Sequence, residues 1–166
     1  MKALQEWTVE AVRAQLKSVK DPEIPVLSLV DLGVITNIEL PSPKAVRVEM
    51  TPTFSGCPAM DVMRQDTENR LRQLGFEDVQ VEINFKESWN SNKMTDYGRE
   101  KLREFGLSPA RPYEGEVDLE EALHEAECPY CSSTRTTMHT PFGPTLCRSI
   151  HYCNNCFQAF EQFKPL

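Results

Sequence analysis

Four cysteines in the last third of the chain have the type and the spacing of metal ligands. They form two Cys-x-x-Cys pairs, Cys128 with Cys131 and Cys153 with Cys156, separated by 21 residues. Each pair can present two thiolates from a tight turn, and two such turns can close a tetrahedral site of four sulfur ligands. The pattern predicts a structural zinc ion. Iron, alone or in an iron–sulfur cluster, fits the same four thiolates and remains an alternative.

Further side chains near these pairs could bind metal or another protein. Cys147 is a fifth thiol. An unpaired cysteine is most often a small buried residue, but Cys147 could also be a spare ligand for a labile or second metal. We expect His139 and His151 to lie on the surface of this segment. Its aromatic side chains either pack a small core or contact a protein partner: Tyr130, Phe142, Tyr152, Phe157, Phe160 and Phe163.

The remaining cysteine, Cys57, precedes a predicted helix. It follows Gly56, and Pro58 is expected in the first helical turn. Backbone dipoles at a helix N-terminus stabilise a thiolate, so the position predicts a lowered thiol pKa and a nucleophile or soft-metal ligand. A small buried residue at a loop–helix junction is the alternative. Asp21 and Glu23 lie in a loop stiffened by two prolines and could approach Cys57 in the fold.

The elements that must position Cys57 have a mixed α and β pattern. Capping residues, with Thr8 and Thr95 among them, and apolar spacing predict helices at 9–19, 58–74 and 95–105. The apolar stripe of the second helix is Met60, Met63, Thr67, Leu71 and Leu74. Alternation predicts strands at 34–40, 46–51 and 79–85. The order is αββαβα, in which the first two strands form a hairpin. The predicted fold class is therefore α+β, a small domain with a three-stranded sheet.

Composition divides the chain into three parts. Residues 1–106 form the predicted α+β domain, 107–127 an acidic linker and 128–166 a β-rich zinc ribbon. Within the linker, 114–127 carries seven Asp or Glu and no Lys or Arg. This pattern predicts a charged spacer, with one or two helical turns near Leu119 as the alternative.

The ribbon should depend on its metal. We expect a hairpin of strands at 134–138 and 145–152, with its turn at Phe142-Gly143-Pro144. A segment of 39 residues cannot bury enough surface to fold alone, so metal binding would supply most of its folding free energy.

Composition and missing motifs exclude several functions. The net charge is −7 and the pI is near 5.0, which disfavours a nucleic-acid binder, and the ribbon has no basic stripe. No membrane span or secretory signal is evident, so we expect a cytoplasmic protein with thiols or metal ligands rather than disulfides. Signatures of nucleotide binding, proteases and hydrolases are absent. The first 123 residues contain no His, so a Cys–His hydrolytic pair at Cys57 is not expected.

Several motifs resemble known families. Asp21-Pro22-Glu23-Ile24-Pro25, Val30-Asp31-Leu32-Gly33-Val34-Ile35, Thr51 and Gly56-Cys57-Pro58 look like the small domain of the iron–sulfur assembly and targeting family, over about residues 8–106. Trp89, the segment 94–109 and Phe142-Gly143-Pro144-Thr145-Leu146-Cys147 extend the likeness over nearly the whole chain. With them the chain resembles the phenylacetate-degradation protein D family, which is associated with a multicomponent phenylacetyl-CoA oxygenase, or 1,2-epoxidase.

The resemblance implies an accessory protein that assists iron or iron–sulfur assembly for this oxygenase system. The oxygenase and reductase subunits are the implied partners, and neither nucleic acid nor a membrane is expected as one. The chain has no di-iron carboxylate motif and no dinucleotide fingerprint, so it is not expected to be the catalytic monooxygenase. By the same resemblance, Cys57 would carry iron or an iron–sulfur unit transiently, with Asp21 and Glu23 nearby.

Two other functions remain open at this point. The chain could be a structural or coupling adaptor of the oxygenase complex that transfers no metal. It could also be an independent thiol redox protein that uses Cys57 and a ribbon thiol such as Cys147. In any of these roles, the free edge of the third strand could pair two copies into a homodimer.

Overall fold

The computed structural model describes residues 6–116 and 118–165 and divides the chain into two units. The N-terminal unit is Met1–Ser88 and the C-terminal unit is Trp89–Leu166. The N-terminal unit contains α1 (Val9–Leu16), β1 (Ile35–Ser42), β2 (Ala45–Met50), α2 (Met60–Gln73) and β3 (Asp78–Ile83). The fold class is confirmed: α+β with a three-stranded sheet, followed by a β-rich ribbon.

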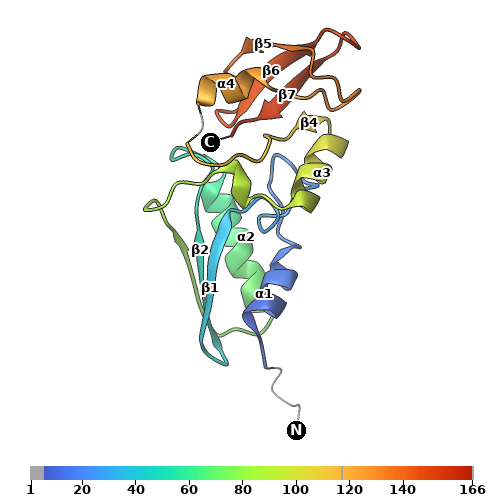
Figure 1. Cartoon of the computed structure of the whole chain (residues 1–166). Helices are drawn as coiled ribbons and strands as arrows, with labels where there is room; N and C mark the ends of the chain where they lie inside the picture. Colours follow the sequence, from blue (N-terminus) through green and yellow to red (C-terminus); the bar gives the residue numbers. More distant parts are fainter. Residues whose placement is uncertain (1–5, 117, 166) are drawn as a thin grey trace. The chain divides into compact units, whose positions relative to one another are not determined.

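The sheet of the N-terminal unit has the order β1-β2-β3. β1 and β2 form the predicted antiparallel hairpin, whereas β2 and β3 are parallel, so α2 is the crossover between them. Both α1 and α2 lie on the same side of the sheet (Figure 1). The core of the unit lies between these helices and the strands.

Each helix of this unit buries one apolar stripe. Thr8 is the N-cap of α1, as the sequence predicted, and its hydroxyl accepts a hydrogen bond from the N–H of Ala11 at 3.1 Å. In α2 the first four positions of the predicted stripe are buried, and the fifth, the C-cap Leu74, is half-buried; the four are Met60, Met63, Thr67 and Leu71. The chain after α2 turns at Gly75, whose φ of +98° suits glycine.

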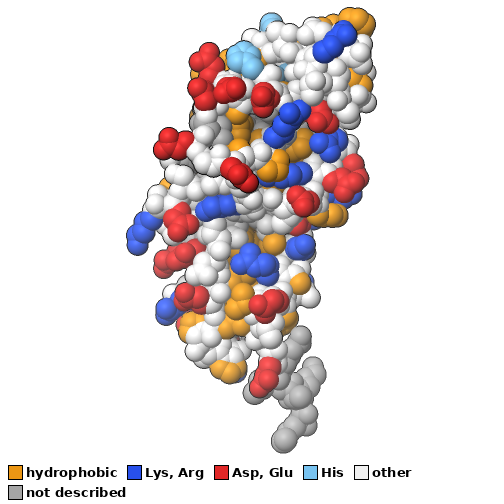
Figure 2. Space-filling view, in the orientation of Figure 1, with side chains coloured by type: hydrophobic (Ala, Val, Ile, Leu, Met, Phe, Trp, Pro, Cys, Tyr) orange, Lys and Arg blue, Asp and Glu red, His pale blue; other side chains and the backbone are white. Residues whose placement is uncertain are grey.

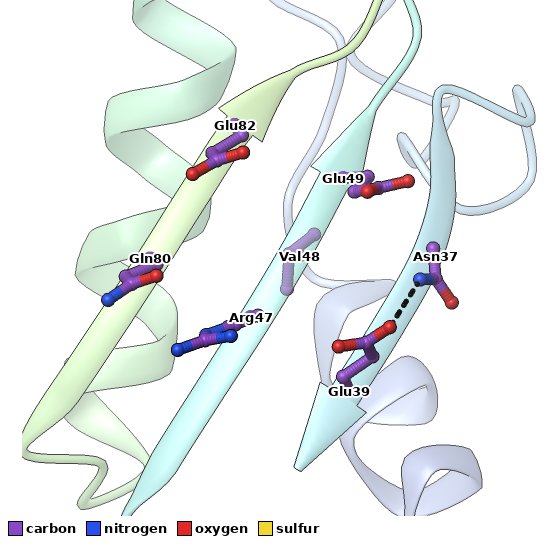
Figure 3. A pocket seen from close by; sticks show the side chains of 7 residues that line it. All are labelled: Asn37, Glu39, Arg47, Val48, Glu49, Gln80 and Glu82. Carbon is purple, nitrogen blue, oxygen red and sulfur yellow. Dashed lines mark hydrogen bonds between the residues drawn. The ribbon is translucent and has the colours of Figure 1, made fainter. Parts of the chain in front are cut away.

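The other face of this sheet is polar and open. Side chains from all three strands surround a hollow of about 180 Å³ (Figure 3): Asn37, Glu39, Arg47, Val48, Glu49, Gln80 and Glu82. The Asn37 side-chain amide donates a hydrogen bond to Glu39 at 3.2 Å. None of the described lining residues is a thiol or a histidine, so the hollow has no ligand for a soft metal.

The C-terminal unit is built on a second sheet, of order β4-β7-β6-β5. Its elements are η1 (Ser91–Lys93), α3 (Asp96–Glu104), β4 (Leu107–Ser108), α4 (Leu119–His124), β5 (Thr136–Thr140), β6 (Arg148–Cys153) and β7 (Ala159–Phe163). β4 pairs with β7 in parallel, and the other pairs are antiparallel. The hairpin β5–β6 lies close to its predicted position.

The division between the units falls earlier than the domain boundary expected after residue 106. Trp89 is buried and packs edge-on against Phe163 of β7, with ring centroids 5.6 Å apart. β4, at the start of the expected linker, extends the ribbon sheet. Because these contacts join residues 89–108 to the ribbon, the last predicted helix, α3, groups with the C-terminal unit.

The rest of the expected linker contains a short helix, α4. Asp118 is the N-cap of α4, where its carboxylate accepts hydrogen bonds from the N–H groups of Glu120 and Glu121. Leu123 and Ala126 are buried. Acidic side chains gather over α4 on the visible surface (Figure 2). This segment is therefore a short helix with solvated acids on its outer side, the alternative that the sequence left open.

None of the helices within 6–116 and 118–165 is long and apolar enough to cross a bilayer.

Candidate metal centre and reactive thiol

Four sulfur atoms converge in the C-terminal unit. The Sγ atoms of Cys128, Cys131, Cys153 and Cys156 all lie within 4.8 Å of one another. Two of the separations are 3.7 Å (Cys128 to Cys156) and 3.6 Å (Cys131 to Cys153). Tetrahedral zinc with Zn–S bonds of about 2.3 Å places its sulfurs about 3.8 Å apart. The geometry therefore fits one four-coordinate, thiolate-bound metal ion.

The same backbone turn presents each ligand pair. The N–H of Ser132 donates to the carbonyl of Cys128 at 2.9 Å, and the N–H of Phe157 donates to that of Cys153 at 3.0 Å. Ser132 and Phe157, each four residues after the first cysteine of its pair, have positive φ of 57° and 62°. Neither is glycine, so no local signal in the sequence predicts this conformation. The two turns are equivalent halves of one site.

Electrostatics at the four thiols favours a bound cation. The backbone N–H of Cys156 lowers the pKa of Cys153 to about 6, and that of Asn155 acts in the same direction. Burial, followed by the three neighbouring thiols, raises the pKa of Cys156 to about 12. Four thiolates so close together repel one another, and a divalent cation removes that cost. The donor set therefore fits a soft metal ion, and the ribbon has a metal-binding site.

The other candidate ligands lie outside this site. Cys147 is buried and is not one of the four clustered thiols. His139 is exposed, as expected. The expectation for His151 is wrong, because this side chain is fully buried. β6 alternates, so His151 faces inward like Cys153 while Tyr152 faces out.

Burial accounts for the state of His151. Its Nε2 lies 2.8 Å from the hydroxyl of Ser149, and its ring stacks on Phe160 at 5.5 Å between centroids. Burial lowers the pKa of His151 to about 4, so the ring is neutral at pH 7. It acts as a packing residue of the small ribbon core.

Cys57 lies just before α2, in the N-terminal unit. Its N–H donates to the carbonyl of Phe54, and its own carbonyl accepts from Met60, both at 3.3 Å. The regular helix begins at Met60, two residues later than the Pro58 start that the sequence predicted. The thiol is half-buried, so a small reagent or a metal ion can reach it.

The predicted direction of the Cys57 pKa is wrong. Burial raises the pKa of this thiol. The backbone N–H of Ala59 lowers it, as expected at a helix start, but the negative charges of Asp21 and Glu23 raise it further. The structure thus brings both carboxylates near the thiol, and together with burial they outweigh the helix terminus.

A rigid loop holds these two carboxylates. Asp21 accepts hydrogen bonds through Oδ1 from the N–H groups of Glu23 and Ile24, at 2.8 and 2.9 Å. A β-bridge between Lys20 and Ser28 closes the loop at its base. Ile24 and Leu27 of this loop are buried, so apolar side chains as well as hydrogen bonds anchor it.

Neutralising both acids is expected to make Cys57 more reactive. The double variant Asp21→Asn/Glu23→Gln removes the two charges that raise the thiol pKa, so the pH midpoint of Cys57 alkylation should move downward. The rate of carbamidomethylation at Cys57, followed by mass spectrometry against pH, measures the midpoint. Asp61→Asn, an 87 % exposed acid in the first turn of α2, is the control. A midpoint that stays or rises in the double variant contradicts the assignment.

Comparison with known proteins agrees with this geometry. The PaaD zinc beta ribbon domain family matches residues 113–164, and the iron-sulfur cluster assembly protein family matches residues 9–83. A protein of Escherichia coli (strain K12), named provisionally as a subunit of 1,2-phenylacetyl-CoA epoxidase, is 36 % identical over 156 residues, which cover 94 % of this chain and 92 % of that protein. The chain belongs to the PaaD family.

Two further relatives each match about three fifths of this PaaD-family chain. An Fe-S protein maturation auxiliary factor of Porphyromonas gingivalis is 34 % identical over 101 residues, 60 % of this chain and 92 % of the relative. The solved structure of a conserved hypothetical protein from Thermotoga maritima has a TM-score of 0.50 at 32 % identity and covers 59 % of this chain and 96 % of its own. This chain thus joins a region similar to iron-sulfur cluster assembly proteins to a zinc-ribbon region.

Proposed function

We propose that this chain is an accessory protein of a phenylacetyl-CoA epoxidase system and delivers iron or iron–sulfur units to its oxygenase or reductase subunits, with Cys57 as the carrying thiol. The observation that supports this most is the position of Cys57, half-buried beside two carboxylates at the start of α2. The match to the iron-sulfur cluster assembly protein family, residues 9–83, includes Cys57.

The surroundings of Cys57 suit a temporary carrier. The raised pKa keeps the free thiol protonated at neutral pH, which limits unwanted oxidation, because the thiolate is the reactive form. An arriving iron cation or cluster replaces the proton, and the charges of Asp21 and Glu23 then favour the bound cation. Of the groups Cys57, Asp21 and Glu23, only the Cys57 thiol is a soft ligand. The iron or iron–sulfur unit can therefore also move on to a site that offers more thiolates.

We also propose that the ribbon metal is zinc and that its role is structural. Four thiolates from two tight turns leave no open position for a substrate. Metal analysis of the purified protein should give about one zinc per chain and no visible absorption band. A coloured protein that contains iron would overturn this assignment.

Replacing Cys57 in cells tests the carrier function. With Cys57→Ser we expect phenylacetyl-CoA epoxidation to fall to the level of a strain without the gene, and iron to be missing from the purified oxygenase or reductase. Ser55→Ala changes an exposed residue two positions away and is the matched control. Normal iron content and activity with Cys57→Ser would refute the transfer role.

A structural adaptor is the second candidate, because several aromatic side chains of the ribbon lie on its surface and do not pack its core. Phe160 and Phe163 are buried, but four other ribbon aromatics are exposed: Tyr130, Phe142, Tyr152 and Phe157. If Cys57→Ser preserves iron content while substitutions of these aromatics separate the chain from the oxygenase subunits, the adaptor function is the correct one.

A further inference from the structure

The C-terminal unit contains a buried lysine. Lys164, just after β7, is only 7 % exposed. Within 6–116 and 118–165 no carboxylate forms an ion pair with its ammonium group. The ring of Phe142 lies over the ammonium nitrogen, 5.4 Å from it. Burying an ammonium group without a compensating negative charge costs free energy. The groups that surround Lys164 therefore decide its charge state.

The residue opposite Lys164 is a thiol. The N–H of Lys164 donates to the carbonyl of Cys147 at 2.9 Å, which continues the antiparallel register of Arg148 with Phe163. Residues directly opposite in such a pair have Cβ atoms about 4.5–5.5 Å apart and side chains on the same face. Cys147 is itself only 8 % exposed, and its sulfur lies 3.1 Å from the hydroxyl of Thr145.

The two groups also affect each other electrostatically. Burial lowers the pKa of Lys164, and the neighbouring Cys147 acts in the opposite direction. A larger fraction of this lysine is therefore present as the neutral amine than of an exposed lysine. A positive charge near the thiol favours its thiolate, the form that reacts with oxidants.

We propose that Cys147 and Lys164 form a redox-responsive pair in which hydrogen peroxide produces a reversible sulfur–nitrogen bond between the two side chains. In the first step the thiolate sulfur attacks one peroxide oxygen. The O–O bond breaks, the sulfur loses two electrons to become sulfenic acid, and the other oxygen leaves as water after taking a proton. In the second step the lysine amine attacks that sulfur, the S–O bond breaks, and hydroxide leaves with the amine proton as a second water.

The surroundings favour the second step over release of the sulfenic acid. The cross-strand position keeps the amine close to the sulfur, so its attack is intramolecular and faster than that of a reagent from solution. The bond would tie the 142–147 segment, which precedes β6, to the end of β7. This modification is independent of the carrier role of Cys57, which lies in the other unit.

Mass spectrometry of peroxide-treated, metal-loaded, full-length protein tests the proposal. We expect a mass lower by two hydrogen atoms, a linked pair of peptides that contain Cys147 and Lys164, and restoration of the original mass by dithiothreitol. Lys164→Arg keeps the positive charge but removes the amine. It should lose the link and instead accumulate a Cys147 sulfenic acid that dimedone captures.

Cys57 is an internal control in the same sample. Carboxylates rather than an amine lie beside it, so its oxidation should give dimedone-reactive sulfenic acid without a lysine link. The proposal is overturned if Cys147 stays reduced, if it forms a disulfide, or if dimedone captures it equally in the wild type and in Lys164→Arg. If the variant fails to fold, the wild-type protein alone still tests the proposal, because the linked peptides are either present or absent after peroxide treatment.

Discussion

Removing the metal from the four-cysteine site is expected to unfold the ribbon while the N-terminal unit stays folded. Among the described residues, the buried cluster beside the site comprises Ala126, Cys128, Cys153 and Phe160, with Cys156 packed against it, so most of its members are ligands themselves. Burial of so small an apolar core releases less free energy than the loss of conformational entropy costs when two turns and three strands become ordered. Structural zinc supplies about 10–16 kcal/mol in small domains, which is as large as the stability of a whole domain, about 5–15 kcal/mol.

The expected result is a partial unfolding that proteolysis can locate. After chelation, or in Cys153→Ser, cleavage should appear in β5–β7 while 9–83 remains protected, because the first sheet has its own buried core. Cys57→Ser, the same chemical change in the other unit, should keep one metal per chain and a protected ribbon. Full protection of β5–β7 in metal-free protein would show that packing alone holds this region.

Local signals were enough for much of this fold. Thr8 and Thr95 cap the helices that the sequence predicted for them, since a cap depends on a few neighbouring residues. The stripe of α2 and the spacing of the four ligand cysteines are also local patterns, and both match the structure. These features need no knowledge of which distant segments meet.

The missed elements depend on distant partners. β7 has polar Glu161 and Gln162 in a run of five residues and becomes a strand because β6 and β4 pair with its two edges. β4 has only two residues among prolines, so it has no pattern of its own. The grouping of α3 with the C-terminal unit also depends on a distant partner. The Trp89–Phe163 contact joins segments that are 74 residues apart in the chain.

The direction of the Cys57 pKa is the clearest limit of local reasoning. The helix start was visible in the sequence, and its lowering effect is present through the N–H of Ala59. The opposing effects come from burial and from a loop more than thirty residues upstream. The effect of Asp21 and Glu23 on the Cys57 pKa depends on how firmly the fold holds their loop. A substitution of Asp31, which is hydrogen-bonded to Ser28 at the base of that loop, tests this dependence.

Asp31→Ala is expected to destabilise the N-terminal unit by about 1–3 kcal/mol, the usual cost of a buried polar group left without its partner. Asp31 is 2 % exposed and accepts a hydrogen bond from the Ser28 hydroxyl at 2.5 Å, while its own N–H donates to the Ser28 oxygen at 3.0 Å. Lys17 neutralises the carboxylate at 3.3 Å. Chemical denaturation followed by circular dichroism measures the loss, and Asp61→Ala, an exposed acid, is the control.

The same variant should also change the reactivity of Cys57. Ser28 closes the loop that carries Asp21 and Glu23, so losing its partner lets both carboxylates move away from the thiol. The pKa of Cys57 should then fall, and its alkylation midpoint should move downward as in Asp21→Asn/Glu23→Gln. A destabilised Asp31→Ala protein with an unchanged midpoint would mean that Ile24 and Leu27 hold the loop alone. If the midpoint does fall, then Asp31, remote in sequence from Cys57, controls the charge around the Cys57 thiol by holding the loop that carries Asp21 and Glu23.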